Sequence, residues 1–342
     1  MLRIWLVFLV ITAANSMENV LAQERDSIFL YKGQLLLGDI KGGKLGYVTI
    51  DETDLGILNV KMYKIRSLKA SNRFRVETST KEFYYGVLQR SPRDGWVNIR
   101  LDDSSIVEAE ILGLNQIMSL EKRFLTRLDG NFSAGFSYTK SNARGQLSYS
   151  STLRYSGERF VNQLSLSGIG TLDSSTYSRD REDGELFTTY NLAATWFLAA
   201  GFNYQRNLEL SIARRFSEML GGGNKLVVSK NFQLRAISGL SFNQEKSTAG
   251  ESSGLLLEVP LVFLFNYFKY QKPNLQISST QSIYYSITQK NRFRFDGYVN
   301  FSWELFWHFY LTLSPYASYD SKPPEGNSNV DYGSAINISF KF

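Results

Sequence analysis

The sequence predicts an all-β protein, in which a transmembrane antiparallel β-barrel of about twelve strands follows a small N-terminal β domain. Three observations support this fold class. Apolar and polar residues alternate over most of residues 124–342, which is the period of a strand with two different faces. The mean hydropathy of −0.22 is too polar for a bundle of membrane helices. The N-terminus has the pattern of an export signal.

Residues 1–22 form the predicted signal peptide. A basic start at Arg3 precedes an apolar run over residues 4–14, and small or aliphatic residues lead up to a cleavage site after Ala22. The alternative is a membrane anchor, but the apolar run is shorter than the ~20 residues that a spanning helix needs. We therefore expect the mature chain to leave the cytoplasm and to enter a membrane only through strands.

Residues 23–121 form a predicted periplasmic β domain with an internal repeat, whose units occupy about residues 28–70 and 74–121. Gly38 and Gly86 hold equivalent places, and each unit closes on an Ile-x-Ser-Leu tetrad. Short strands separated by Gly and Asp turns predict a small barrel similar to Sm-like or SH3-like modules. Its role is open between a periplasmic binding module and a structural plug or spacer under the barrel.

The predicted outer-membrane barrel occupies residues 124–342. Strands are expected at residues 124–139, 143–156, 159–172, 185–193, 196–206, 210–228, 231–244, 252–266, 274–286, 292–304, 308–320 and 331–342. Polar loops at 173–184, 245–251 and 321–330 all fall on one side of this count, and short joins fall on the other. Segment 210–228 fits least well, because Arg214, Arg215 and three consecutive glycines interrupt the alternation and suggest a turn, bulge or short helix.

The last strand carries the clearest alternation. Its large residues are Tyr332, Ile336, Ile338, Phe340 and Phe342, and the chain stops on that final aromatic residue. Such a strand is similar to the assembly signal of bacterial outer-membrane barrels. We therefore expect outer-membrane lipid and the barrel-assembly machinery as partners, with the C-terminal strand as the contact for the latter.

Charged residues at mid-strand distinguish this pattern from a secreted β-sandwich, because a wet lumen tolerates them. The lumen-facing candidates are Arg154, Arg235, Arg294, Asp296 and Glu304. They would either set ion selectivity and bind a polar solute, or pair with one another and fill a narrow interior. The second alternative is slightly favoured, because paired interior charges need no solute.

Composition excludes several kinds of site. The absence of Cys excludes disulfides and Cys-ligated zinc. The single histidine, His308, is expected near a membrane interface, so a Ser-His hydrolase is a distant alternative. We predict no catalytic residue, metal site or cofactor. The net charge of +6 is spread without a basic run, so no nucleic-acid partner is expected.

Several segments resemble one family of outer-membrane proteins. These are the Tyr-Asp-Ser-x-Pro-Pro loop that begins at Tyr319, the Trp196-Phe197 pair, the segment Tyr204-Gln205-Arg206-Asn207 and the glycine-rich stretch that begins at Gly221. Over residues 124–342 the chain is similar to the salt-induced outer membrane protein family, a barrel domain of unknown function. The resemblance implies a location and an architecture, and it implies no activity.

The leading functional hypothesis from the sequence is a small channel or solute-permeation barrel with a periplasmic module. A non-conducting structural or envelope-stress protein, whose soluble module binds a periplasmic protein or the cell wall, is the alternative. An outer-membrane lipid hydrolase is the distant third.

Overall fold

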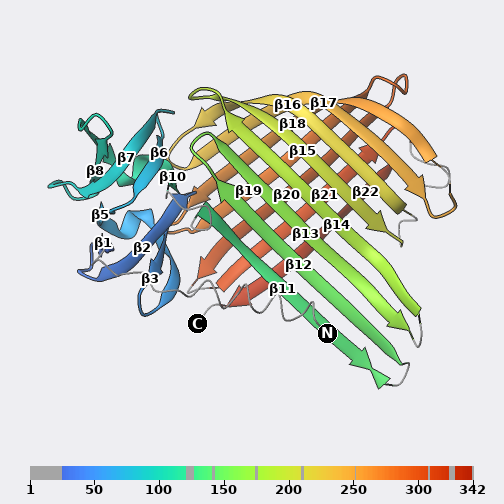
Figure 1. The fold of residues 1–342 in the computed structure, drawn as a ribbon, viewed down its shortest axis with the longest axis horizontal. Coiled ribbons are helices and arrows are strands. Elements are labelled where there is room, and N and C mark those ends of the chain that lie inside the picture. The colour runs from blue at the N-terminus through green and yellow to red at the C-terminus, as the bar shows by residue number, and fades with distance from the viewer. Residues whose placement is uncertain are drawn as a thin grey trace, which may run out of the picture.

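The computed structural model describes residues 25–120, 127–140, 143–173, 176–208, 212–250, 252–306, 309–322 and 328–340. The chain forms two antiparallel β-sheets, one from each predicted domain (Figure 1). The all-β prediction is therefore confirmed. The predicted signal peptide, His308 and Phe342 lie outside the described residues.

The N-terminal domain contributes ten described strands to one sheet. They are β1 (Asp26–Leu30), β2 (Leu35–Lys44), β3 (Tyr47–Glu52), β4 (Gly56–Lys61), β5 (Ile65–Lys69), β6 (Arg73–Thr78), β7 (Phe83–Arg90), β8 (Trp96–Leu101), β9 (Ile106–Glu110) and β10 (Leu114–Ser119). β1 pairs with β2 and β5, and β6 pairs in the same way with β7 and β10. A ladder between β10 and β2 joins the two halves. The predicted repeat and the small-barrel closure of each half remain predictions.

The core of this domain is formed by the alternate apolar residues of its strands. Ile28, Ile40, Phe74 and Ile99 are completely buried in one cluster. Asp26 is buried beside them, and its carboxylate accepts hydrogen bonds from the backbone N–H groups of Ile40 and Ser71 at 2.9 and 2.8 Å. Burial nevertheless raises the pKa of the Asp26 carboxyl above its ordinary value.

The second sheet contains twelve strands among the described residues, and each pairs with its neighbours in sequence from β11 to β22. They are β11 (Leu128–Thr139), β12 (Arg144–Ser156), β13 (Phe160–Asp173), β14 (Thr176–Asn191), β15 (Trp196–Asn207), β16 (Ile212–Val228), β17 (Phe232–Ser247), β18 (Ser252–Lys269), β19 (Leu275–Ser286), β20 (Phe293–Phe306), β21 (Phe309–Asp320) and β22 (Val330–Phe340). The predicted strand number and order are confirmed.

Two local predictions were wrong. The polar segment 173–184 is mostly strand, because β14 begins at Thr176 and pairs with β13 along its length. Its charged side chains pair with each other, as Arg181 does with Asp183 at 2.8 Å, so the segment stays polar without becoming a loop. Segment 210–228 contains no interrupting turn or helix: β16 is one continuous strand with two register shifts.

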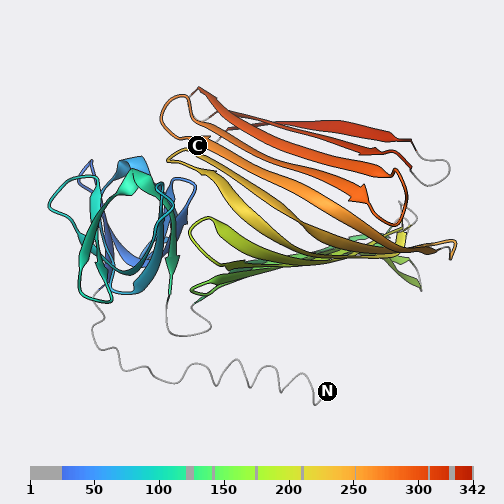
Figure 2. The ribbon, with the colours of Figure 1, turned by 90° about the horizontal axis from the view of Figure 1, so that it is seen from above.

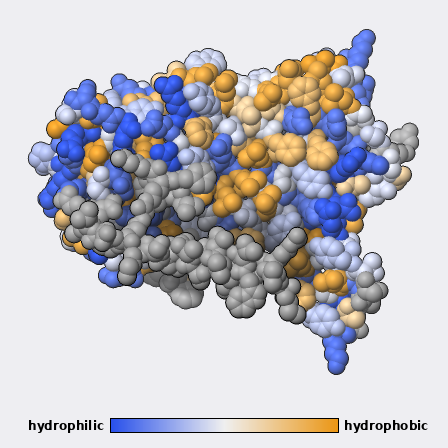
Figure 3. All heavy atoms as spheres, in the orientation of Figure 1, coloured by the Kyte–Doolittle hydropathy of each residue, from blue (hydrophilic) through white to orange (hydrophobic). Residues whose placement is uncertain are grey.

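The two faces of the twelve-stranded sheet differ in character. Large apolar side chains stand on the outer face, and many are exposed (Figure 3). Phe132, Phe136, Tyr332, Ile336 and Ile338 each expose between 64% and 78% of their surface. Exposed apolar area on this scale is unusual for a protein that faces water on all sides.

The sheet curves strongly, so that its first and last strands face each other across its inner side (Figure 2). β11 and β22 are its two edges, and within the described residues no ladder joins them. The predicted closure into a barrel is therefore not confirmed. What the structure contains is an open, curved sheet with an apolar outer face.

The N-terminal domain lies at one end of this sheet, against the turns that connect its strands (Figure 2). The Lys225 ammonium on β16 contacts the Glu77 carboxylate on β6 at 2.8 Å, and both residues are buried. The Tyr270 hydroxyl donates to the Leu45 carbonyl oxygen at 2.7 Å. Gly46 has positive φ there, and a Cβ on it would lie 2.7 Å from the Tyr270 ring. The domain therefore docks through buried contacts.

Candidate functional site

The inner face of the curved sheet holds the candidate site, because polar and charged side chains gather there around two cavities. The far cavity, of about 400 Å³, lies at the end away from the N-terminal domain. The junction cavity, of about 340 Å³, lies between the sheet and that domain. The two differ in how their charges are balanced.

The far cavity is lined by arginines that are paired with carboxylates. Arg294 on β20 donates two hydrogen bonds to Glu258 on β18, at 3.0 Å from Nε and 2.7 Å from Nη2. Glu258 is completely buried and also accepts a hydrogen bond from the Asn243 amide at 2.6 Å. The Arg294 guanidinium lies 4.6 Å from the centre of the Tyr284 ring. The pair is therefore bidentate, and its buried carboxylate has a third hydrogen bond.

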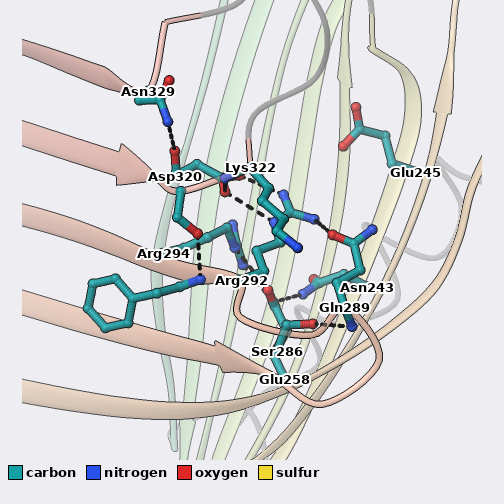
Figure 4. A network of polar contacts seen from close by, with 12 residues as sticks. Asn243, Glu245, Glu258, Ser286, Gln289, Arg292, Arg294, Asp320, Lys322 and Asn329 are labelled. Atoms are coloured by element: carbon teal, nitrogen blue, oxygen red, sulfur yellow. Dashed lines mark hydrogen bonds and ion pairs between the residues drawn. The ribbon is translucent and has the colours of Figure 1, made fainter.

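Two more pairs complete the same lining, and Figure 4 shows the residues of the first, Arg292 and Asp320. Arg292 donates to both oxygens of Asp320, at 3.1 and 2.6 Å. Arg215 on β16 contacts Glu245 on β17 at 2.7 Å. Every arginine that lines this cavity therefore has a carboxylate partner. The far cavity fits the prediction that interior charges pair with one another.

An apolar layer separates the two cavities. Phe197, Ala199 and Ile237 are buried together on the inner face of β15 and β17, and Met219 packs on them. Phe187 packs on the same layer and lines both cavities. The layer narrows the space between the two ends of the sheet on this side.

The junction cavity is rich in cations. Lys44 and Arg75 reach it from the N-terminal domain, and Arg154, Lys225 and Arg235 reach it from β12, β16 and β17. Glu77 is the one carboxylate in its lining, and both of its oxygens accept from the Lys225 ammonium at 2.8 Å. Arg75, Arg154 and Arg235 form no salt bridge with any residue that the structure describes.

The predicted lumen charges thus lie at four different places on the inner face. Arg294 is paired in the far cavity, whereas Arg154 and Arg235 line the junction cavity without a carboxylate partner. Glu304 lies at the domain end of β20, where it accepts a hydrogen bond from Asn274 at 2.9 Å. Asp296 is exposed on the same face as Arg294. The five residues share one face of the sheet but do not form one site.

Sequence reasoning missed Glu258 and Lys225, which are the central buried charges of the two regions. Glu258 is the one carboxylate within the apolar segment 255–265. A single charged residue in such a segment indicates a functional position, so the sequence could have identified Glu258. Lys225 gave no comparable signal, because its partner Glu77 belongs to another domain. Arg215 was noticed only as a break in the alternation.

Two kinds of feature are absent from the part of the chain that the structure describes. It holds no cluster of three or more side chains suited to a metal ion. No helix within the same residues is long and apolar enough to cross a membrane.

The chain is similar to a known protein family. A family described as "Protein of unknown function, DUF481" matches residues 132–342. This range covers nearly all of the twelve-stranded sheet and excludes the N-terminal domain. No curated protein matches the chain.

Proposed function

The chain belongs to the DUF481 family of proteins of unknown function, and from this premise we propose that it is a bacterial outer-membrane β-barrel that passes small polar solutes. The N-terminal domain would lie in the periplasm and cover the inner mouth. The match to the family does not indicate an activity. Support therefore has to come from the site and from the faces of the sheet.

The observation that carries the proposal is the contrast between the two faces of the sheet. Exposed aromatic and aliphatic side chains on the outside suit contact with lipid, and the charged inner face suits water and solutes. Within the described residues no ladder joins the edge strands β11 and β22. Open backbone groups are not stable in lipid, so these edges would pair with each other when the protein is in a membrane.

The proposed route runs through the far cavity, past the apolar layer and into the junction cavity. The docked domain then stands at its end, held by the buried contact between Lys225 and Glu77. We infer that this contact holds the domain in a covering position. Solute passage would then depend on the position of the N-terminal domain at the inner mouth as well as on the charges of the lumen.

Conductance in planar lipid bilayers tests this proposal. The full mature chain should give discrete current steps of low frequency. Glu77→Lys should give larger or more frequent steps, because it sets a like charge beside Lys225 and weakens docking. Glu110→Gln is the matched control, because its contact with Lys230 is at the exposed rim and contributes little. Absence of steps from all three proteins would reject the permeation proposal.

A non-conducting structural or envelope-stress protein is the second candidate. The apolar layer around Phe197 and Ile237 favours it, because this layer and the docked domain lie in series along the inner side. In that case the N-terminal domain, which we propose to be an Sm-like or SH3-like module, would bind a periplasmic protein or the cell wall. We propose no enzymatic activity for either candidate, and no nucleic-acid partner.

A further inference from the structure

The junction cavity holds more positive charge than its own carboxylates balance. Four of its cations are Lys44, Arg75, Arg154 and Arg235, in addition to Lys225, whose charge Glu77 neutralises. Glu77 also attracts Arg75 and Arg235, and Asp129, an exposed residue of the edge strand β11, attracts Lys44 and Arg154. These two carboxylates face five cations. The cavity therefore keeps a net positive charge.

These cations lie near one another as well as near the cavity. Arg154 is close enough to repel Lys44, Arg75 and Arg235 electrostatically. Lys225 in turn is repelled by Arg75 and Arg235. The residues come from two domains and five strands, so docking of the N-terminal domain brings this repulsion about. An arrangement that costs electrostatic free energy without an anion is stabilised when an anion binds.

One arginine of the cavity has a donor with no partner among the described residues, and a second arginine donates to neutral oxygens. The Arg154 Nε is buried and has no hydrogen-bond partner. Arg75 exposes only 2% of its surface, and its guanidinium donates to two neutral oxygens, the Glu158 carbonyl at 2.6 Å and the Gln116 side chain at 3.4 Å. Burial lowers the pKa of Arg75, and it also lowers the pKa of Lys44, on which Arg154 acts in the same direction. An oxyanion in the cavity would satisfy these donors and offset that effect.

We propose that the junction cavity binds a small solute that carries a phosphate group. Arginine guanidinium groups present planar pairs of N–H donors that match phosphate oxygens, and a single phosphate can accept from several arginines at once. The cavity of about 340 Å³ is larger than phosphate alone. Gln163, Gln233 and Asn266 line the remaining space and would hydrogen-bond the hydroxyl groups of a phosphorylated sugar or a similar ester.

This inference names a ligand for one end of the proposed route, and it rests on the docked arrangement rather than on conductance. Binding in detergent micelles would stand even if the protein passed no current. The two proposals can therefore fail separately.

Calorimetric titration of the full mature chain, folded in detergent, with inorganic phosphate tests the proposal. We expect saturable binding to the unaltered protein. Arg235→Gln and Arg154→Gln should each weaken it by about tenfold or more, because each removes charge-assisted hydrogen bonds to the anion. Arg214→Gln is the control, since it removes the same charge from an exposed position on β16. Circular dichroism of each variant would confirm an unchanged strand content.

Two further measurements make the test decisive. Arg235→Lys keeps the charge and loses the planar donor pair, so an intermediate affinity is expected. A second titration replaces phosphate by vesicles that contain phosphatidylglycerol, with phosphatidylcholine vesicles as the reference. Binding to the anionic vesicles without any binding of free phosphate would overturn the proposal in favour of a lipid head group. Equal phosphate affinity in the Arg235→Gln and Arg214→Gln proteins would also overturn it.

Discussion

At the scale of single residues, burial decides which charged pairs matter. Glu258 is completely buried on β18, and its pairing with Arg294 is supported by a third hydrogen bond from Asn243. Arg144 and Asp173 form a pair of the same chemistry at 3.1 Å, but their side chains are 56% and 50% exposed. A buried carboxylate that loses its partner cannot be rescued by water, whereas an exposed one can.

The first prediction compares these two pairs. Arg294→Ala leaves the completely buried Glu258 carboxylate without its arginine and should lower the free energy of unfolding by about 3–5 kcal/mol. Arg144→Ala should lower it by at most about 1 kcal/mol, because Asp173 is exposed to water. Urea unfolding in detergent micelles, followed by tryptophan fluorescence, measures both. Equal losses would mean that the far cavity is wet enough to screen its charges.

The alternation predicted which charged residues face inward, but it did not predict the residues with which they pair. Arg154, Arg235 and Arg294 were placed on the inner face from their parity alone. Arg294 meets Glu258 across two intervening ladders, and Lys225 meets Glu77 in another domain. Such contacts depend on the curvature of the sheet and on domain docking, which single-strand periodicity does not contain.

At the scale of elements, glycine explains why the segment that broke the pattern is nonetheless a strand. β16 and β17 approach closely where Gly221 and Gly239 face each other across the ladder. A Cβ on Gly239 would lie 2.1 Å from the Leu220 carbonyl oxygen, and one on Gly221 would lie 2.3 Å from that of Ser238. Gly222, by contrast, has no atom nearer than 4.0 Å to its Cβ position. The glycine run permits close backbone approach and does not mark a turn.

The second prediction follows from this difference between neighbouring glycines. Gly239→Ala should lower the free energy of unfolding by about 1–3 kcal/mol, since the backbone must move to relieve the overlap. Gly222→Ala should have little effect or be slightly stabilising, because the methyl group meets open space. The same urea titration distinguishes them. A tolerated Gly239→Ala would show that the two strands can separate without loss.

Strand boundaries were predicted within a few residues for most of the sheet, because an apolar outer face and a polar inner face give a strict alternation along each strand. The exception is β14, which begins nine residues earlier than its charged sequence indicated. The first part of β14 carries polar and charged residues on both faces, so the alternation is lost there. Polarity then no longer distinguishes it from a loop.

At the scale of the whole molecule, the unpaired edges are the main question. β11 and β22 expose most of their residues, and their backbone groups on one side have no ladder partner in the described structure. In a bilayer such groups cost several kcal/mol each if they stay unpaired. The sequence predicted the strand number that permits closure, but alternation within strands says nothing about which edges meet.

The third prediction concerns this closure. In a detergent gel without heating, the folded mature chain should migrate faster than the boiled chain, because a closed barrel stays compact. A variant truncated after residue 329, which lacks β22, should lose that difference. If both proteins migrate alike with and without heating, the sheet stays open in detergent.

The pairing of every strand of the second sheet with its neighbour in sequence has a kinetic consequence. Each of these ladders can form by local hairpin zipping, which is fast because little loop entropy is lost. Joining β11 to β22 would instead bring together segments about two hundred residues apart. That single nonlocal contact would form last and limit the rate, so a catalyst of membrane insertion would have most to gain by holding the final strand.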